Sequence, residues 1–295
     1  MIIDIDKISV AERQNYLQHA IAPRPICFAS TVDKNGNVNL SPFSFFNLFS
    51  TNPAVIVFSP SRRVRDNTIK HTLENLREVP EVAVNIVDYE MVQQTSLASC
   101  DFPRDVNEFM KAGFTEQPST LIKPPMVKES KVKMECRVME IKVLGNEGGA
   151  GNLVLCEVLR MHIDESILDA KGYIDQTKLH QVARLGGDWY SVVNESNLFK
   201  VEKPNVKLGI GMDALPVNLR TSRILSGNNL GQLANVHELP VIDPSFEDSR
   251  LTNIFQYYAV NPEEMEKEIQ LYAKELLDKG DVRAAWQVLL ATNES

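Results

Sequence analysis

Residues 40–54 read LSPFSFFNLFSTNPA and mix aromatic and hydrogen-bonding side chains within one short run. The run holds four phenylalanines, four hydroxyl residues and two asparagines, and it closes with Asn52-Pro53. Core packing accounts for some of the aromatic side chains, and we expect at least two of the four phenylalanines to serve only that purpose. The other groups predict a surface that faces a planar molecule with hydrogen-bonding edges.

The segments around this run predict antiparallel strands. ICFASTV (26–32) is followed by Asn35-Gly36, a dipeptide typical of a tight hairpin turn, and AVIVF (54–58) is a short apolar strand. In KVKMECRVMEIKVL (131–144) the apolar residues change phase between positions 138 and 139, which is the pattern of a β-bulge. Short strands with few long helices between them predict a mainly β fold, a Greek-key antiparallel barrel with peripheral helices.

Helical periodicity is confined to a few segments of this region. In DNTIKHTLENLRE (66–78) apolar residues recur at helical spacing, and Asp66 or Asn67 can cap the start. We also expect a helix around 89–99 and a short helical piece that ends at Gly113.

The chain changes character near residue 200, which predicts a barrel domain over 1–200 and a C-terminal extension over 201–295. Residues 209–236 predict loop and short strand, and the end of the chain predicts two helices joined at Lys279-Gly280-Asp281. An apolar stripe along the first of these helices favours packing onto the body or a second subunit over use as an interaction helix. The stripe consists of Met265, Ile269, Tyr272 and Leu276.

Composition and charge argue against several classes of partner. The chain has 295 residues with a net charge of -8 and an isoelectric point near 5.3, which argues against nucleic-acid binding. The first residues, MIIDIDKISV, lack the apolar segment of an export signal. No run approaches the roughly 20 apolar residues that span a bilayer. We therefore expect no membrane partner and a cytoplasmic location.

Several chemistries have little support in the sequence. The four cysteines are scattered, which predicts no disulfide framework and, for three of them, a buried apolar role. The five histidines show no metal-binding spacing, so we expect no metal site. Residues 209–214 satisfy G-x-G-x-x-A, but Pro216 follows at once, where a dinucleotide fingerprint needs a long helix. We identify no catalytic residue.

Residues 59–75, SPSRRVRDNTIKHTLEN, form the densest basic and polar cluster of this acidic chain. Fixed cations, hydroxyl groups and the amides of a helix N-terminus are the groups that hold a phosphate monoester. A solvated charged surface is the alternative interpretation of the same residues. The phosphate-binding interpretation gains support because the aromatic run precedes the same apolar strand. The cluster comprises Ser59, Ser61, Arg62, Arg63, Arg65, Thr68, Lys70 and Thr72.

With these features the chain resembles the flavin reductase-like family of FMN-binding split-barrel proteins, near its flavoredoxin branch. The first two of the stretches that carry the resemblance are the most diagnostic. Together the stretches cover about residues 20 to 195 in the order typical of the family. They are PRPICFASTVDKNGNVNLSPFSFFN (23–47), NPAVIVFSPSRRVRDNTIKHTLENL (52–76), VNEFMKAGF with KPPMVKESKVKMECRV (106–138) and VARLGGDWYSVV (182–193).

The resemblance implies three groups of residues around the cofactor. The isoalloxazine ring would contact the S-F-F-N segment and the strand before it: Ser44, Phe45, Asn47 and either Ser30 or Thr31. The ribityl phosphate would contact the K-x-T-x-x-N element and residues ahead of it: Lys70, Thr72, Asn75, Ser59 and Arg62. The R-L-G-G turn would approach the flavin or the substrate mouth: Arg184, Gly186 and Gly187. The family often has Asp where this chain has His71, whose role stays open.

The same resemblance implies a function. It implies an FMN-binding oxidoreductase that takes hydride from NADH or NADPH and passes electrons to a small-molecule or protein acceptor. It also implies a homodimer with the flavin near the subunit boundary. Two alternatives remain: an FMN-holding electron carrier or redox sensor without reductase activity, and a split barrel that has lost its cofactor and serves as an interaction module.

Overall fold

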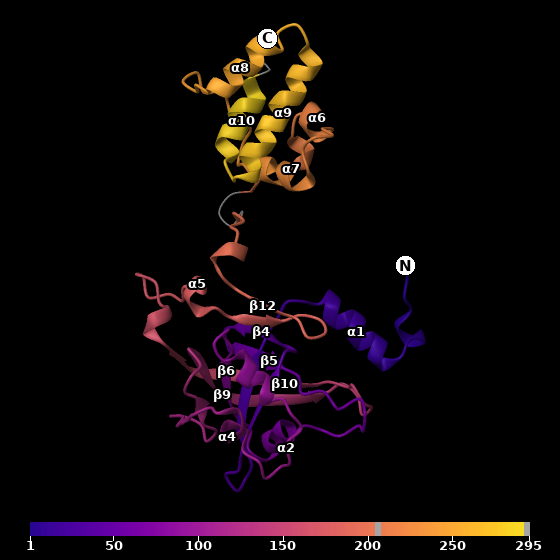
Figure 1. The fold of residues 1–295 in the computed structure, drawn as a ribbon, viewed down its shortest axis with the longest axis vertical. Coiled ribbons are helices and arrows are strands. Elements are labelled where there is room, and N and C mark those ends of the chain that lie inside the picture. The colour runs from indigo at the N-terminus through magenta and orange to yellow at the C-terminus, as the bar shows by residue number, and fades with distance from the viewer. Residues whose placement is uncertain (204–207, 292–295) are drawn as a thin grey trace. The chain divides into compact units, whose positions relative to one another are not determined.

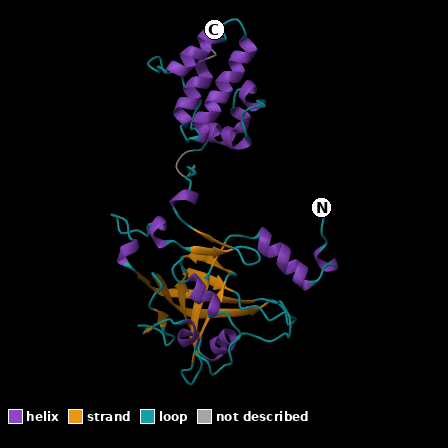
Figure 2. Cartoon of the chain, viewed as in Figure 1, coloured by secondary structure: helices purple, strands orange, loops and turns teal. Residues whose placement is uncertain are grey.

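The chain folds into two compact units, Met1–Phe199 and Lys200–Ser295. The computed structural model describes residues 1–203 and 208–291. Strands form the framework of the first unit, and the described part of the second unit consists of helices and their connections (Figures 1 and 2). Each unit encloses a hydrophobic core of its own.

A seven-stranded antiparallel sheet is the framework of the first unit, with the strand order β3-β2-β6-β9-β10-β5-β4. The hairpin predicted around Asn35-Gly36 is confirmed, because β2 and β3 pair on either side of it. The strands of this sheet are β2 (Cys27–Val32), β3 (Val38–Phe43), β4 (Phe46–Thr51), β5 (Ala54–Phe58), β6 (Glu81–Ile86), β9 (Val132–Val143) and β10 (Asn152–Ile163).

The two edge strands of this sheet follow one another directly in the chain. β3 ends at Phe43 and β4 begins at Phe46, so three Cα–Cα steps, at most about 11 Å, separate the two edges. The sheet must therefore curl until its edges meet at this corner, although within the described residues no ladder joins them. The predicted antiparallel barrel is confirmed in this split form. The connection from β3 to β4, which we call the crossing, lies within the aromatic run 40–54.

The bulge predicted between residues 138 and 139 is confirmed. Val138 pairs with Cys156 and Glu140 pairs with Leu155, so Met139 is left out of the β9–β10 ladder. An extra residue on one strand bends it, and bending lets these two long strands follow the curvature of the barrel.

Smaller elements surround the sheet. A three-stranded sheet has the order β1-β11-β12, and β7 pairs with β8. These strands are β1 (Arg24–Pro25), β7 (Glu116–Gln117), β8 (Met126–Val127), β11 (Val182–Arg184) and β12 (Tyr190–Val192). The helices of this unit are α1 (Val10–Ala20), α2 (His71–Glu78), α3 (Val92–Leu97), α4 (Glu108–Ala112) and α5 (Gln176–Leu179), with short 3₁₀ turns at Ile5–Lys7, Glu165–Ile167 and Glu195–Asn197.

The start predicted for α2 is wrong by about one turn. The helix begins at His71 and not near Asp66. Asp66 accepts a hydrogen bond from the Thr68 amide at 3.1 Å, and Asn67 adopts a left-handed φ of 57°. These residues form a tight turn ahead of the helix. The short piece predicted to end at Gly113 is confirmed as α4, which Gly113 closes with a φ of 73°.

The main core of the first unit lies between the curled sheet and α2. Leu73 and Leu76 of α2 pack there beside Phe43 and Phe58. The apolar role predicted for three cysteines is confirmed, since Cys27, Cys136 and Cys156 belong to this core and Cys100 is exposed. Burial raises the pKa of the three core thiols.

The second unit is a small helical bundle. The predicted pair of terminal helices is confirmed, joined at Gly280 with a φ of 82°. The loop and short strand predicted over 209–236 are wrong in part, because two helices form there. A capping box between Ser226 and Asn229 starts the second of them despite its glycines. The helices are α6 (Val217–Arg220), α7 (Gly227–Ala234), α8 (Ser249–Tyr257), α9 (Pro262–Asp278) and α10 (Val282–Leu290), with a 3₁₀ turn at Met212–Ala214.

The helices of the described part of the chain are all too short or too polar to cross a bilayer.

Candidate functional site

A small pocket of about 20 Å³ lies between β3 and the start of α2. Two strand residues, the end of the basic cluster, the first turn of α2 and the segment after α3 contribute to it. We call it the cationic pocket. Its lining residues are Asn39, Ser41, Arg63, Lys70, His71, Thr72, Ala98, Cys100, Asp101, Phe102 and Glu108.

Two hydrogen bonds hold α2 against the sheet below this pocket. The Thr72 hydroxyl donates to Asn39 Oδ1 at 2.7 Å, and the Asn75 amide donates to Thr31 Oγ1 at 3.2 Å. Thr31 and Asn39 are paired residues of β2 and β3. The two hydrogen bonds therefore hold one face of α2 against this one cross-strand pair. The structure thus brings together Thr31, Thr72 and Asn75, with Thr31 and Thr72 fully buried.

A buried carboxylate orients the base of the pocket. Glu108 accepts hydrogen bonds from the Asn39 amide at 2.9 Å and from the Leu40 backbone N–H at 3.0 Å. The Asn39 amide nitrogen faces Glu108, so its oxygen faces Thr72. Burial raises the pKa of Glu108, and the hydrogen bonds it accepts oppose that rise. Sequence reasoning missed Glu108 and Asn39, which carry no motif and lie far apart in the chain.

Three cations converge on the carboxylate of Asp101 at the pocket rim. Arg63 donates to Asp101 Oδ1 from Nη2 at 2.9 Å and from Nε at 3.1 Å. Lys70 Nζ lies 3.2 Å from the same oxygen, and Arg65 Nη2 lies 2.8 Å from Oδ2. The hydrogen bond from Arg63 and the nearby charge of Lys70 lower the pKa of Asp101 to about 2, although burial opposes them.

The start of α2 adds to the positive potential of the pocket. Lys70 is the N-cap residue and makes no side-chain cap. A helix N-terminus carries partial positive charge and favours anions, so a cation at this position makes an anionic ligand more favourable still. Burial lowers the pKa of His71 from its ordinary value; Glu74 opposes the shift, and the positive charges of Arg104, Arg63 and Lys70 add to it. His71 lines the pocket, and the lowered pKa disfavours a positive charge on its imidazole.

Arg62 and Ser59 have other partners in the structure. Arg62 donates from Nε to Asn67 Oδ1 at 2.5 Å and from Nη2 to the Asn67 carbonyl at 2.6 Å. Ser59 is buried, its hydroxyl accepts from the Asn152 backbone N–H at 3.1 Å, and its own N–H donates to Phe45 O at 2.8 Å. Arg63 and Arg65, not Arg62, share the Asp101 carboxylate with Lys70. Nothing in the sequence distinguishes which of the three arginines contacts Asp101.

The aromatic run divides into core and surface. Phe43 is buried and Phe46 packs against the same core, which confirms that at least two phenylalanines serve as packing. Phe45 is 43% exposed and Phe49 is 68% exposed. We call Ser44, Phe45 and Asn47, at the crossing, the aromatic ledge. Asn47 Oδ1 accepts from the Leu48 backbone N–H at 2.8 Å.

β3 connects the cationic pocket to the aromatic ledge. Asn39 and Ser41 line the pocket, and Ser44 follows Ser41 by three residues, which is about 10 Å along an extended chain. Cations at one end and a half-exposed phenylalanine with amide and hydroxyl groups at the other fit a planar ring that carries a phosphate. The donor set therefore fits FMN.

Arg184 lines a different pocket, of about 360 Å³, and Gly186 is not among the residues that line it. The Arg184 guanidinium stacks on Tyr190 at 4.6 Å and donates to the Gly187 carbonyl at 2.6 Å. Gly186 permits the close approach of His19, because a Cβ there would lie 2.2 Å from the imidazole. α3 separates this pocket from the cationic pocket. Gln93 and Ser96 of the helix line the 360 Å³ pocket, and Ala98, just after the helix, lines the cationic pocket.

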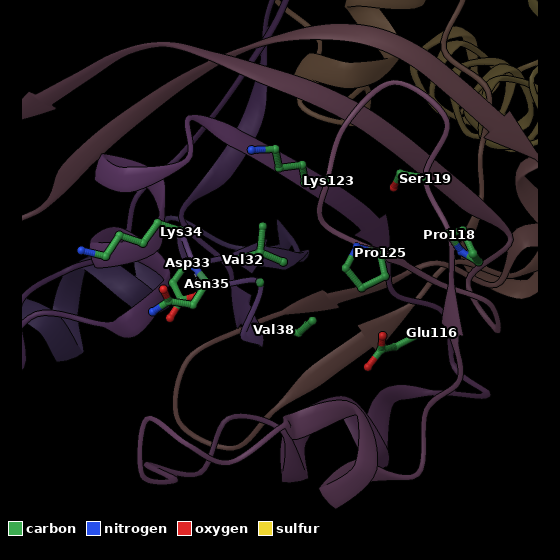
Figure 3. Close-up of a pocket in the computed structure, with 11 residues that line it drawn as sticks. Val32, Asp33, Lys34, Asn35, Val38, Glu116, Pro118, Ser119, Lys123 and Pro125 are labelled. Carbon is green, nitrogen blue, oxygen red and sulfur yellow. Dashed lines mark hydrogen bonds between the residues drawn. The ribbon is translucent and has the colours of Figure 1, made fainter.

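A larger pocket, of about 720 Å³, lies beside the hairpin turn of β2 and β3 (Figure 3). Its walls come from the turn itself and from the segment between β7 and β8, including Lys34, Glu116 and Lys123. None of the residues predicted from the sequence to bind the cofactor lines it.

Comparison with known proteins agrees with this fold. The family model of the flavin reductase-like domain matches residues 19–183. A protein from Halalkalibacterium halodurans is 33% identical over 208 residues, which cover 70% of this chain and 98% of that protein.

Two solved structures share the fold. Component B of nitrilotriacetate monooxygenase from Bacillus cereus has a TM-score of 0.64 and 30% identity, with 68% of this chain and 98% of that chain covered. A putative flavin reductase with a split barrel domain, from Shewanella frigidimarina, has a TM-score of 0.59 and 23% identity, with 69% and 99% covered.

The first unit is a split barrel of the flavin reductase type. The chain belongs to the flavin reductase-like domain family.

Proposed function

We propose that the protein is an FMN-binding oxidoreductase that takes hydride from NADH or NADPH and passes electrons to an acceptor. The observation that carries the proposal is the continuous path from the cationic pocket along β3 to the aromatic ledge. Family membership supports a flavin as the bound group. The flavin, when bound, supplies the redox chemistry, and the protein supplies binding and orientation.

Each group of side chains has a role in this proposal. Lys70 and the first turn of α2 bind the phosphate. Ser59 and Arg62, which were predicted to take part, do so by stabilising the loop ahead of α2. Ser44, Phe45 and Asn47 present an apolar surface and hydrogen-bonding groups to the ring. Arg184 and Gly186 form the mouth through which a nicotinamide or an acceptor approaches. No side chain is required to move a proton, since hydride transfer needs no general acid.

The proposal includes a homodimer. Apolar side chains are exposed on three strands of the sheet, and their burial against a second copy would remove them from water. These side chains are Leu48 and Phe49 of β4, Met139 of β9 and Met161 of β10. The measurement is the mass in solution by light scattering, and a monomer at micromolar concentration would contradict this part.

The visible absorption spectrum of the protein purified without added flavin, and again after FMN addition and desalting, tests the cofactor. Retained flavin bands, with FMN released on denaturation, are the expected result, followed by bleaching with NADH or NADPH without oxygen. A protein that remains colourless would overturn the proposal. Bound FMN that neither nicotinamide reduces would instead identify an electron carrier or a redox sensor.

Titration of Lys70→Ala tests the phosphate end separately. We expect its FMN affinity to fall about tenfold, the effect of losing one charge-assisted contact. Affinity for riboflavin, which lacks the phosphate, should stay unchanged. Equal losses for the two ligands would contradict the role of Lys70.

A further inference from the structure

Asp101 is the acidic group that faces the three cations together. Its Oδ1 contacts Arg63 at 2.9 Å and Lys70 at 3.2 Å, while its Oδ2 contacts Arg65 at 2.8 Å. The carboxylate therefore uses both of its oxygens on the groups that a phosphate would need. We propose that Asp101 is an intramolecular competitor for the phosphate group, and that a phosphate monoester binds by displacing it. This inference rests on the proposed phosphate-binding function of the cationic pocket.

The small size of the pocket favours such a displacement. Its volume of about 20 Å³ compares with the 10–15 Å³ or so that a single water molecule needs. A phosphate group with its oxygens is several times larger than a water molecule. It can take the position between Arg63, Arg65 and Lys70 only if the Asp101 side chain leaves that position.

The segment that carries Asp101 makes local backbone hydrogen bonds, and Arg104 near its other end pairs with Glu74 of α2. It lies between the end of α3 at Leu97 and the start of α4 at Glu108. Backbone hydrogen bonds in this segment are local, as from Cys100 to the Leu97 carbonyl and from Phe102 to the Cys100 carbonyl. The segment is mostly exposed, and the Asp101 side chain itself is 35% exposed.

The exchange selects for dianions. When a monoanion replaces Asp101, one negative charge leaves the cations and one arrives, so the charge balance at the pocket does not change. A phosphate monoester brings close to two negative charges at pH 7 and therefore gains from the exchange. A phosphate monoester therefore displaces Asp101 from the cations, whereas chloride or a phosphodiester does not.

The test compares FMN and riboflavin titrations of the wild type and of Asp101→Asn. Removal of the competitor should tighten FMN binding about tenfold and leave riboflavin binding unchanged. Asp101→Glu, which keeps the charge, should behave as the wild type. Glu157→Gln is the control for net charge, because Glu157 pairs with Arg137 on β9 at 2.6 Å and takes no part in the pocket.

Two outcomes would overturn the inference. FMN affinity in Asp101→Asn that is unchanged or weaker, with an unchanged circular dichroism spectrum, would show that Asp101 holds the cations in place for the ligand. A tightening of equal size in Glu157→Gln would show an effect of net charge alone.

Inorganic phosphate separates this inference from the proposed function. Phosphate should raise the melting temperature of Asp101→Asn more than that of the wild type, whether or not flavin binds. If the wild type binds no FMN but this difference is present, the proposed function fails and the competition by Asp101 stands. Equal shifts in the two proteins would overturn the competition.

Discussion

Neighbouring residues of the basic cluster have different roles in the folded chain. Arg62 is bound to Asn67, while Arg63 and Arg65 reach Asp101 from the same loop. The sequence placed all three arginines in one cluster predicted to hold a phosphate, and the family resemblance singled out Arg62, whereas Arg63 and Arg65 join Lys70 in the structure. Which arginine faces the pocket depends on Asp101, which lies 38 residues from Arg63 in the chain.

Asp101 should leave a signature in acid stability. Its folded pKa of about 2 lies below the ordinary 3.8, so its contribution is present above pH 3.8 and is lost as pH falls through 2. After a discount for its solvent exposure, we expect the wild type to lose about 1 kcal/mol more unfolding free energy than Asp101→Asn between pH 4 and pH 2.

Urea denaturation followed by circular dichroism at several pH values measures this difference. The comparison must be made without phosphate in the buffer, because phosphate would bind at the cations. If the unfolding free energies of the two proteins changed equally with pH, the ion pairs of Asp101 would not contribute the expected stability.

At the scale of elements, the crossing between β3 and β4 decides the architecture. Two residues join the edges of the sheet, so the strands can remain paired only if the sheet curls. The same crossing exposes Phe45 and buries Phe43, because Phe43 is the last residue of β3 and packs into the core, whereas Phe45 lies in the bend between β3 and β4. A ligand surface and a core surface therefore come from one run of sequence.

β9 supplies a second element-scale constraint through Glu135, whose side chain is fully buried. It accepts hydrogen bonds from the Thr120 backbone N–H at 2.9 Å, from Leu121 at 2.5 Å and from the Thr120 hydroxyl, and His162 Nε2 lies 2.6 Å away. Burial acts to raise its pKa, yet the hydrogen bonds prevail and lower the pKa to about 2.

Replacement of Glu135 should loosen the segment between β7 and β8. Glu135→Gln keeps the size but removes an acceptor that several donors share, and we expect a loss of about 2–3 kcal/mol in unfolding free energy. Glu129→Gln is the matched control, because exposed Glu129 accepts one backbone N–H of Thr115. Urea titrations compare the three proteins, and equal stability of the two variants would contradict the role of the buried carboxylate.

At the scale of the whole molecule, two cores imply two cooperative units. The core of the helical unit includes Leu277 and Trp286, each 1% exposed. The other tryptophan, Trp189, is 74% exposed in the first unit. The emission of Trp286 therefore reports on the helical unit once Trp189 has been replaced.

Leu277→Ala in a Trp189→Phe background tests this separation. A cavity in the helical core should reduce its unfolding free energy by about 3 kcal/mol, seen as an earlier red shift of Trp286 emission in urea. FMN affinity at low urea should remain that of the parent. A parallel loss of FMN affinity would show that the flavin unit depends on the helical one.

The local features and the family can be predicted from residues close together in the chain. Strand periodicity, the Asn35-Gly36 turn, the phase jump at Met139 and the pair of terminal helices are all encoded by residues close together in the chain. α7 escaped prediction because its glycines and asparagines are poor helix formers, and burial of Leu233 outweighs that propensity.

The assembly of the candidate site depends on contacts between residues far apart in the chain. The partners Thr31 and Asn75, Asn39 and Glu108, and Arg63 and Asp101 are separated by 44, 69 and 38 residues. Side-chain direction at such positions follows from the curl of the sheet and the docking of α2, which no local pattern encodes. The physical reason is that hydrogen bonds and ion pairs of this kind form between surfaces that packing brings together.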